Sequence, residues 1–195
     1  MTINGKVGAT TISSLKVDAF IIGFNHNSGK EGSNRIHFLL GKISGKFVGL
    51  VDSSYGSTTS TSGAFTMNTS NTNSGGWGSS QMRSKVLGSA SSPTSPTANT
   101  LMAALPSDLR AVMKSCTKYT DNKGGSNTAS NVSSTTDYLF LLSEYEVFAT
   151  HQYCNDAEPN YQAQYDYFKA GNSKVANKHS ATGTAAVWWL RSPNF

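Results

Sequence analysis

The amino-acid sequence predicts a single α+β domain. Its 195 residues are enough for one sizeable hydrophobic core. Short apolar runs typical of strands alternate with three short stretches of helical periodicity, and long polar loops separate them. The sequence shows no internal repeat. A βαβ array would need a helical crossover between successive parallel strands, whereas here long polar loops separate the predicted elements. The α+β class is therefore favoured.

The first elements are predicted to be strands. Residues 17–24 form an apolar run, and residues 35–40 and 46–51 predict a hairpin that turns at residues 44–45. Residues 53–62 consist almost entirely of Ser, Thr, Gly and Tyr. They have no apolar periodicity, which predicts a loop.

Two helices are predicted in the middle of the chain. Residues 73–77 lead into a short helix, in which Met82 and Val86 lie four residues apart and which Gly88 ends. After a proline-containing loop, Pro106 begins a second helix. Its apolar stripe, at i, i+3, i+4 and i+7, consists of Leu109, Val112, Met113 and Cys116. This stripe places the Cys116 thiol on the core face.

The last third of the chain combines apolar runs with helix signals. Residues 138–142 are apolar throughout and predict a buried strand, and Ser143 and Glu146 follow at the spacing of a capping box. A third helix is expected to begin at Pro159, with an aromatic face formed by Tyr161, Tyr165 and Phe168 and a stop at Gly171. Residues 188–190, which precede Pro193, predict the end of another buried strand.

Composition narrows the functional classes. Charged residues make up 14% of the chain, against about 25% in ordinary soluble domains, and Ser, Thr, Asn and Gly take their place. Such surfaces are common in secreted, cell-surface and virion proteins. The net charge of +5 comes from 16 basic and 11 acidic residues, and the lysines are scattered singly, which indicates solvated surface and no nucleic-acid partner. No signal peptide or membrane-spanning run is visible, so we expect synthesis in the cytoplasm and no membrane insertion.

Searching for catalytic chemistry gives negative results. The histidines are dispersed without metal-ligand spacing, and Cys116 and Cys154 lie 38 residues apart without a C-x-x-C motif. No G-x-S-x-G motif occurs, and residues 41–47 imitate a phosphate loop but lead into a strand. Glu144 and Glu146 offer a pair of carboxylates, although Glu146 is better explained by the capping box. We therefore predict no catalytic residue, no metal and no cofactor.

Two groups of aromatic and polar residues are candidates for binding. Tyr153, Asn155, Tyr161 and Tyr165 are of the types that form adaptable contacts in binding loops. The alternative is that these tyrosines edge the core and keep their hydroxyls in water. Trp188 and Trp189 point to opposite sides if they lie in a strand, so at least one belongs to the core. The alternative for them is an aromatic platform for a sugar.

Five segments in order along the chain resemble a bacterial and prophage domain family that is catalogued only as a domain of unknown function. They are residues 19–27 (AFIIGFNHN), 73–83 (NSGGWGSSQMR), 105–109 (LPSDL), 137–144 (DYLFLLSE) and 188–193 (WWLRSP). Members of that family often occur in phage tail or surface proteins. The family is in turn similar to the C-type-lectin-like fold of the formylglycine-generating enzyme and of the variable receptor-binding proteins of diversity-generating retroelements.

The resemblance implies a C-type-lectin-like domain over residues 17–195, preceded by an extension over residues 1–16. It implies a non-enzymatic structural or receptor-binding component of a phage virion, at the tail, baseplate or capsid surface. One alternative is a carbohydrate-binding adhesion module at the cell surface. A second is an enzyme of the formylglycine-generating type, which loses support because neither Cys116 nor Cys154 matches the catalytic motif of that enzyme.

The chain departs from the family's pattern at its end. In the family a polar segment and a closing strand usually follow the WWLRSP motif, and here the sequence ends at Phe195. Ligand-binding positions therefore do not transfer. We expect the exposed side to be covered by another chain, a second copy or an assembly partner, with Trp188 or Trp189 at the contact. In the alternative, residues 1–16 fold back through Val7 and Ile12 and supply the missing strand.

Overall fold

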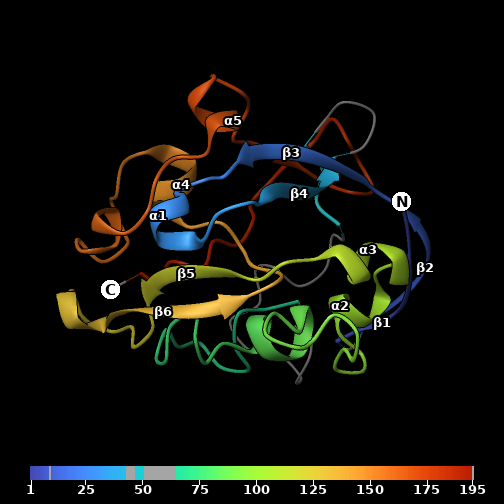
Figure 1. The fold of residues 1–195 in the computed structure, drawn as a ribbon, viewed down its shortest axis with the longest axis horizontal. Coiled ribbons are helices and arrows are strands. Elements are labelled where there is room, and N and C mark those ends of the chain that lie inside the picture. Colours follow the sequence, from blue (N-terminus) through green and yellow to red (C-terminus); the bar gives the residue numbers. More distant parts are fainter. Residues whose placement is uncertain (9, 43–46, 51–64, 195) are drawn as a thin grey trace.

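The computed structural model describes residues 1–8, 10–42, 47–50 and 65–194 (Figure 1). Its helices are short, and its sheets, within the described residues, each consist of two antiparallel strands, which confirms the α+β class. The strand pairs are β1 (Thr2–Val7) with β2 (Thr10–Lys16), β3 (Asp18–Phe24) with β4 (Ile36–Lys42), β5 (Cys116–Asp121) with β6 (Val132–Asp137), and β7 (Ala176–Asn177) with β8 (Ala185–Ala186). No helix in these ranges is long and apolar enough to cross a membrane.

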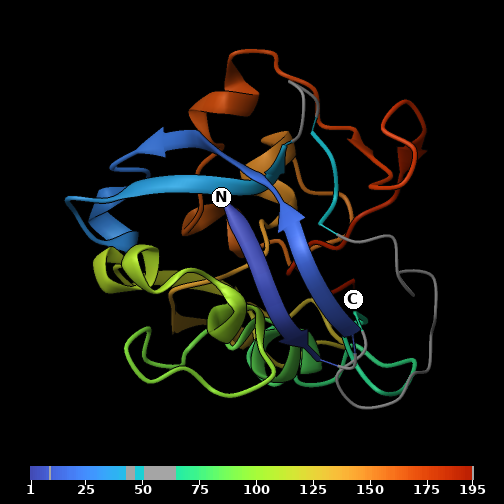
Figure 2. The same cartoon turned by 90° about the vertical axis from the view of Figure 1, so that its right-hand side faces the viewer.

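The N-terminal hairpin belongs to the main core. β1 and β2 lie side by side on the face shown in Figure 2 and pack against helix α2 (Leu101–Ala104). Ile3, Val7 and Ile12 are buried in one cluster with Trp77. In the described sheets β1 and β2 pair only with each other. The alternative in which residues 1–16 supply a strand to the tryptophan segment is therefore wrong.

The strand predicted at residues 17–24 is confirmed as β3, but its partner was not predicted. β4 pairs antiparallel with β3, whereas the sequence predicted a hairpin between residues 35–40 and 46–51. Val48 instead forms a parallel bridge with Asn177. The expected turn at residues 44–45 and the expected loop at 53–62 lie outside the described residues.

The helix signals of the middle of the chain were partly correct. A one-turn π-helix, η1 (Met82–Leu87), ends at Gly88, whose φ of 65° is left-handed and suits glycine. Helix α3 (Ser107–Val112) begins after Pro106 but ends four residues before Cys116. The predicted apolar stripe is therefore wrong, and Val112 is 72% exposed. Cys116 is buried as predicted, but as the first residue of β5.

The predicted strand at residues 138–142 is also wrong. The strand of this region, β6, comes earlier, and residues 138–142 run on from it without a strand partner. Leu142 instead accepts a hydrogen bond through its carbonyl from the backbone N–H of Arg191. The capping box is confirmed, because Ser143 Oγ and the Glu146 carboxylate bond reciprocally to backbone N–H groups at the start of helix α4 (Glu144–Phe148).

The predicted third helix is divided in two. A short 3₁₀ turn, η3 (Glu158–Asn160), contains Pro159, and helix α5 (Asp166–Lys169) follows separately.

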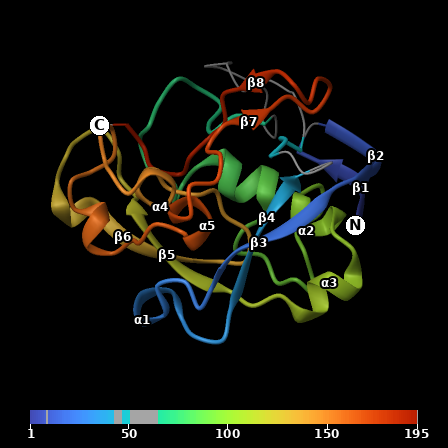
Figure 3. The same ribbon diagram turned by 90° about the horizontal axis from the view of Figure 1, so that it is seen from above.

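Another 3₁₀ turn, η2 (Ala129–Asn131), precedes β6, and helix α1 (Ser28–Glu31) connects β3 to β4. Seen from above, α5 lies beside β3 (Figure 3). Phe168 of α5 and Ile22 of β3 form a second buried cluster with Tyr165.

The tryptophan segment is not a strand. β8 ends at Ala186, and residues 188–190 have no strand pairing, which corrects the sequence prediction. Both indoles are nevertheless partly buried. Trp188 packs against the second cluster and Trp189 against the first, so the segment connects the two cores. Their burial comes from side-chain packing and does not require a sheet.

Candidate functional site

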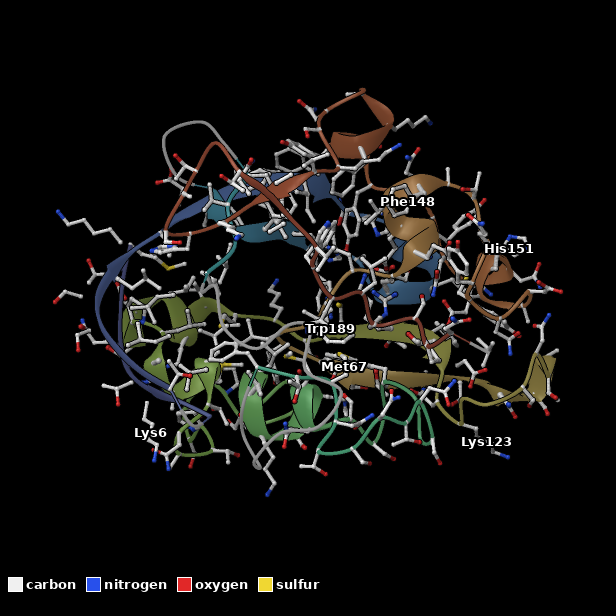
Figure 4. All side chains as sticks on the ribbon, turned by 180° about the vertical axis from the view of Figure 1, so that it is seen from behind. Lys6, Met67, Lys123, Phe148, His151 and Trp189 are labelled. Carbon is white, nitrogen blue, oxygen red and sulfur yellow. The ribbon has the colours of Figure 1, made fainter. Side chains whose placement is uncertain are left out.

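A cleft of about 750 Å³ separates the tryptophan segment from an earlier loop. One wall is residues 188–194 and the other is residues 66–76. Viewed from behind, Trp189 and Met67 lie close together at the middle of the molecule (Figure 4). The volume falls within the range of roughly 300–1,000 Å³ that is typical of ligand pockets. We call this feature the cleft.

The loop wall of the cleft is fixed by backbone packing and amide hydrogen bonds. Asn68 donates from Nδ2 to the Thr72 carbonyl (2.8 Å), and Asn73 donates from Nδ2 to the Asn194 carbonyl on the opposite wall. Gly76 has a φ of 50°, and a Cβ there would lie 2.0 Å from the Asp121 carbonyl oxygen. Only glycine lets the loop lie this close to the end of β5.

The lining of the cleft is partly polar, partly apolar and almost uncharged. Apart from Arg191, its described residues are neutral: Thr66, Met67, Asn68, Ser70, Asn71, Thr72, Asn73, Gly76, Trp188, Trp189, Leu190, Ser192, Pro193 and Asn194. Ser70 and Asn71 are exposed, and neither side chain makes a hydrogen bond with the rest of the described chain. Their hydroxyl and amide groups are therefore available to a ligand.

Arg191 lines the cleft, but its guanidinium is buried in the interior. Nη1 and Nη2 bind the two oxygens of Glu146 at 2.5 and 2.8 Å, a bidentate pair. Nε donates to Thr120 Oγ1, and Nη1 also donates to the Leu141 carbonyl, both at 2.8 Å. Arg191 is 1% exposed, so its charge is directed away from the cleft.

Glu146 also pairs with a second buried cation, Lys118 of β5. The Lys118 ammonium donates to Glu146 Oε1 (2.9 Å), Glu31 Oε2 (2.6 Å) and the Tyr165 hydroxyl (2.9 Å), which uses all three of its hydrogens. We call Glu31, Lys118, Glu146, Tyr165 and Arg191 the ion cluster. Each of its residues is at most 2% exposed.

Charge balance keeps Glu146 and Arg191 ionised. Burial by itself raises the pKa of Glu146, but the charges of Arg191 and Lys118 outweigh burial and hold that pKa well below its usual range. Burial lowers the pKa of Arg191, yet the adjacent Glu146 raises it above its ordinary value. The capping-box role of Glu146 was predicted, and its pairing with two cations was not.

A hydrogen-bonded chain continues from the ion cluster to two histidines. The Tyr165 hydroxyl accepts from Lys118 and therefore donates to His37 Nδ1 at 2.7 Å. Burial, aided by Lys118, lowers the pKa of His37 to about 4, so this ring is neutral at pH 7. His26 stacks on the Tyr165 ring and donates from Nε2 to the Ala163 carbonyl. His37 Nε2 is buried without a partner in the described residues.

His26, Glu31 and His37 form the kind of group that can hold a metal. One ligand atom from each lies within 4.8 Å of the other two. Sequence spacing did not reveal this group, because its members come from the turn before α1 (His26), from α1 (Glu31) and from β4 (His37). The Lys118 ammonium, however, lies 2.6 Å from Glu31 Oε2 and already neutralises that carboxylate. A divalent ion would face this positive charge, so the arrangement favours the ammonium as resident cation. The predicted lack of a metal stays a prediction.

Other motif residues bind one another in the interior. Trp77 Nε1 and Arg83 Nε donate to the two oxygens of Asp137 at 3.0 and 2.9 Å. These contacts tie the 73–83 motif to the end of β6. The Glu144 carboxylate accepts three backbone N–H groups, from Gln152, Tyr153 and Cys154. The sequence motifs thus supply structural contacts among the described residues.

The thiols are buried in apolar or acidic surroundings. Burial raises the pKa of Cys116 to about 12. Burial and the neighbouring carboxylates of Glu158 and Glu144 raise the pKa of Cys154 above its ordinary value. Because the thiolate is the reactive form, neither cysteine is a poised nucleophile at neutral pH.

The four predicted ligand-binding residues do not form one surface. Tyr153 is 56% exposed, and Tyr161 stacks on Tyr119 with its ring partly covered. Asn155 and Tyr165 are buried, and both of their polar groups are hydrogen-bonded in the interior. A ligand on the molecular surface would reach Tyr153 and part of Tyr161 only. The ligand-binding role of the set stays a prediction.

An exposed apolar face lies elsewhere, on the hairpin of β3 and β4. Ile21 pairs with Phe38 across the strands, and Phe24 pairs with Ile36. All four side chains are between 44% and 62% exposed. In Figure 2 this hairpin and the C-terminal segment lie toward opposite sides of the molecule. Contiguous apolar surface of this kind marks contact sites in many proteins.

These features define an α+β domain with a buried ion cluster and a neutral surface cleft. The chain belongs to the family described as "Domain of unknown function (DUF6273)", whose profile matches residues 57–195. No curated protein and no solved structure matches the chain. The matched region contains both walls of the cleft and, within the ion cluster, all but Glu31.

Proposed function

We propose that the chain is a non-enzymatic, C-type-lectin-like domain that serves as a structural or receptor-binding component of a phage particle. The observation that carries the proposal is the chemistry of the cleft. Acid–base or nucleophilic catalysis needs a titratable group, or a nucleophile with an adjacent base, within reach of the ligand. Within the described lining, the one titratable side chain is Arg191, and its guanidinium is bound to Glu146 in the interior.

The formylglycine-generating alternative finds little support in the thiols. That chemistry requires reactive cysteines, whereas Cys116 and Cys154 are at most 4% exposed and have raised pKa values. The assignment to a phage particle rests on the motif resemblance and on the composition, which is low in charge and rich in Ser, Thr and Asn. The exposed apolar face of β3 and β4 supports an assembly role, because an assembly partner would cover it. The partner contact predicted at Trp188 or Trp189 was argued from a strand that the structure does not contain, and we place the assembly partner on the β3–β4 face instead.

Mass spectrometry of purified particles tests this proposal. Particles should be induced from the strain that encodes the chain and separated on a density gradient. The protein should then co-sediment with the major capsid and tail proteins at a fixed copy number. Recovery of the protein only from the soluble lysate, with intact particles that lack it, would contradict the proposal.

A further inference from the structure

We infer that the cleft binds a neutral oligosaccharide. This inference rests on the proposed binding role and names the class of its ligand. Three features of the cleft carry it: the absence of available charge in the described lining, the polar groups that remain unpaired there, and the two indoles on one wall.

The charge of the lining selects against ionic ligands. No carboxylate, lysine or histidine contributes to the described walls, and the guanidinium of Arg191 is satisfied by Glu146, Thr120 and Leu141. An anionic ligand, such as a phosphate or an acidic sugar, would lose its hydration without gaining a counter-charge. A cationic ligand would meet the same cost. A neutral ligand that forms hydrogen bonds avoids both penalties.

The available hydrogen-bonding groups are amides and hydroxyls. Asn68 and Asn73 are engaged in holding the loop, whereas Ser70 and Asn71 are exposed and unpaired within the described residues. Asn194, on the opposite wall, is exposed too. An amide offers both donors and an acceptor, and a hydroxyl can act as either. Such groups complement the hydroxyl groups of a sugar, which also donate and accept.

Trp188 and Trp189 both contribute to one wall of the cleft, and both side chains are held by packing. Trp188 donates from Nε1 to the Lys174 carbonyl (3.2 Å), and its ring packs edge-on against Phe47 with centroids 5.2 Å apart. Trp189 packs against the main core. Both rings are fixed before any ligand arrives, which reduces the entropy lost on binding. The C–H groups of a sugar ring carry small positive partial charges and pack favourably on the negative face of an aromatic ring.

A peptide fits this cleft less well than a sugar. Extended peptides gain affinity by adding a strand to an exposed sheet edge. None of the strands in the described chain falls within residues 66–76 or 188–194. Several loop N–H groups are already paired: those of Thr72 and Gly76 within the loop, and that of Gly75 with the Lys123 carbonyl. The cleft therefore offers side-chain hydrogen bonds and ring packing, which suit a carbohydrate.

A glycan array tests the inference directly. The purified full chain should be applied to neutral gluco-, galacto- and manno-oligosaccharides beside sialylated and sulfated counterparts. We expect binding to one or more neutral glycans. The affinity for the best of these, measured by titration calorimetry, should fall at least tenfold in the double variant Ser70→Ala/Asn71→Ala. The matched control Asn160→Ala changes an exposed asparagine outside the cleft and should bind like the unaltered chain.

The outcomes separate this inference from the proposed function. Any of three results would overturn the inference: binding confined to acidic glycans, no binding to any glycan, or equal binding by the double variant and the unaltered chain. A particle-associated protein that binds no glycan would leave the proposed function standing and exclude the sugar. If the protein binds a neutral glycan but is absent from particles, the sugar-binding inference stands and the proposed role in a phage particle is excluded. Thermal unfolding of the double variant, expected to match that of the control, confirms that the variant is folded.

Discussion

The ion cluster and the cleft both include Arg191, but their polar groups lie in opposite environments. In the ion cluster, two cations and two carboxylates are buried, and every charge has a partner within 2.9 Å. In the cleft, Ser70 and Asn71 are neutral, exposed and without a partner among the described residues. The comparison shows that burial, and not polarity alone, decides whether a group serves the fold or is free to bind.

The physical reason is desolvation. A buried ion loses its hydration, so removing one member of a buried pair leaves an uncompensated charge that destabilises the protein strongly. An exposed amide keeps its water until a ligand replaces it, so its loss changes stability little. The two regions should therefore respond differently to substitution, and the predictions below run from the largest expected effect to the smallest.

Replacing Arg191 by methionine should cause the largest loss of stability. The change leaves a shorter, uncharged side chain, removes four hydrogen bonds and leaves Lys118 as the one cation paired with Glu146 among the described residues. We expect the free energy of unfolding in urea to fall by about 3–5 kcal/mol. The control Lys85→Met alters an exposed lysine and should change it by less than about 0.5 kcal/mol. A loss below about 1 kcal/mol for Arg191→Met would mean that the ion cluster is dispensable.

Replacing Asp137 by asparagine should have a smaller effect. The amide of the variant has one acceptor oxygen, while Trp77, Arg83 and Thr135 all donate to the carboxylate at present. At least one buried donor loses its partner, which costs about 1–3 kcal/mol. Guanidinium unfolding should show this loss, and Asp18→Asn, at an exposed aspartate, should not. An unchanged midpoint for Asp137→Asn would indicate that these bonds contribute nothing net.

Acidification should destabilise the protein partly through His37. The pKa of this ring is about 4 in the folded protein and 6.5 without the influence of the fold. Between these values the unfolded chain binds a proton that the folded chain does not, so stability falls as the pH falls from about 6.5 toward 4. The slope for one such group is at most about 1.4 kcal/mol per pH unit.

His37→Asn should remove that part of the pH dependence. The asparagine carbonyl can accept the Tyr165 hydroxyl in place of Nδ1 and does not titrate. Unfolding free energies measured at intervals from pH 7 to pH 4 should give a flatter curve for the variant. His151→Asn, at an exposed histidine, should keep the original slope. Identical slopes for His37→Asn and the unaltered chain would show that His37 does not titrate as described.

The cysteines should react only after unfolding. Cys116 is 4% exposed and has a pKa of about 12, and Cys154 is 1% exposed. Iodoacetamide at pH 8 should leave both thiols unmodified in the native protein for hours, and in urea it should label both within minutes. Intact-mass spectrometry measures the two states. Rapid labelling of native Cys116 would contradict its burial.

Local signals of the sequence were the ones that succeeded. The capping box of Ser143 and Glu146, the stop at Gly88 and the strand at residues 17–24 each depend on neighbouring residues, and the structure contains all three. The stripe that ends at Cys116 failed, although its spacing was helical. Helix α3 ends at Val112, and strand β5, which pairs with β6, begins at Cys116. Sheet pairing there outweighs a weak helical preference.

Long-range contacts were not predictable in the same way. Lys118 meets Glu31 across 87 residues and Glu146 across 28, and no spacing rule connects residues so far apart. The cleft joins residues 66–76 to residues 188–194, so its neutral lining became visible only in the fold. The same holds for the pairing of β4 with β3 across the residues that contain α1.

Comparing the two regions in a single unfolding experiment tests the central claim. Glu146→Gln removes the carboxylate that pairs with Arg191 and Lys118, and Ser70→Ala/Asn71→Ala removes the unpaired groups of the cleft. Urea unfolding should show a loss of about 3–5 kcal/mol for the first variant and less than about 0.5 kcal/mol for the second. The account would be contradicted if Glu146→Gln were as stable as the unaltered chain, or if the cleft variant lost much stability. The first result would mean that the charged ion cluster does not stabilise the fold, and the second that the neutral cleft is not left free to bind a ligand.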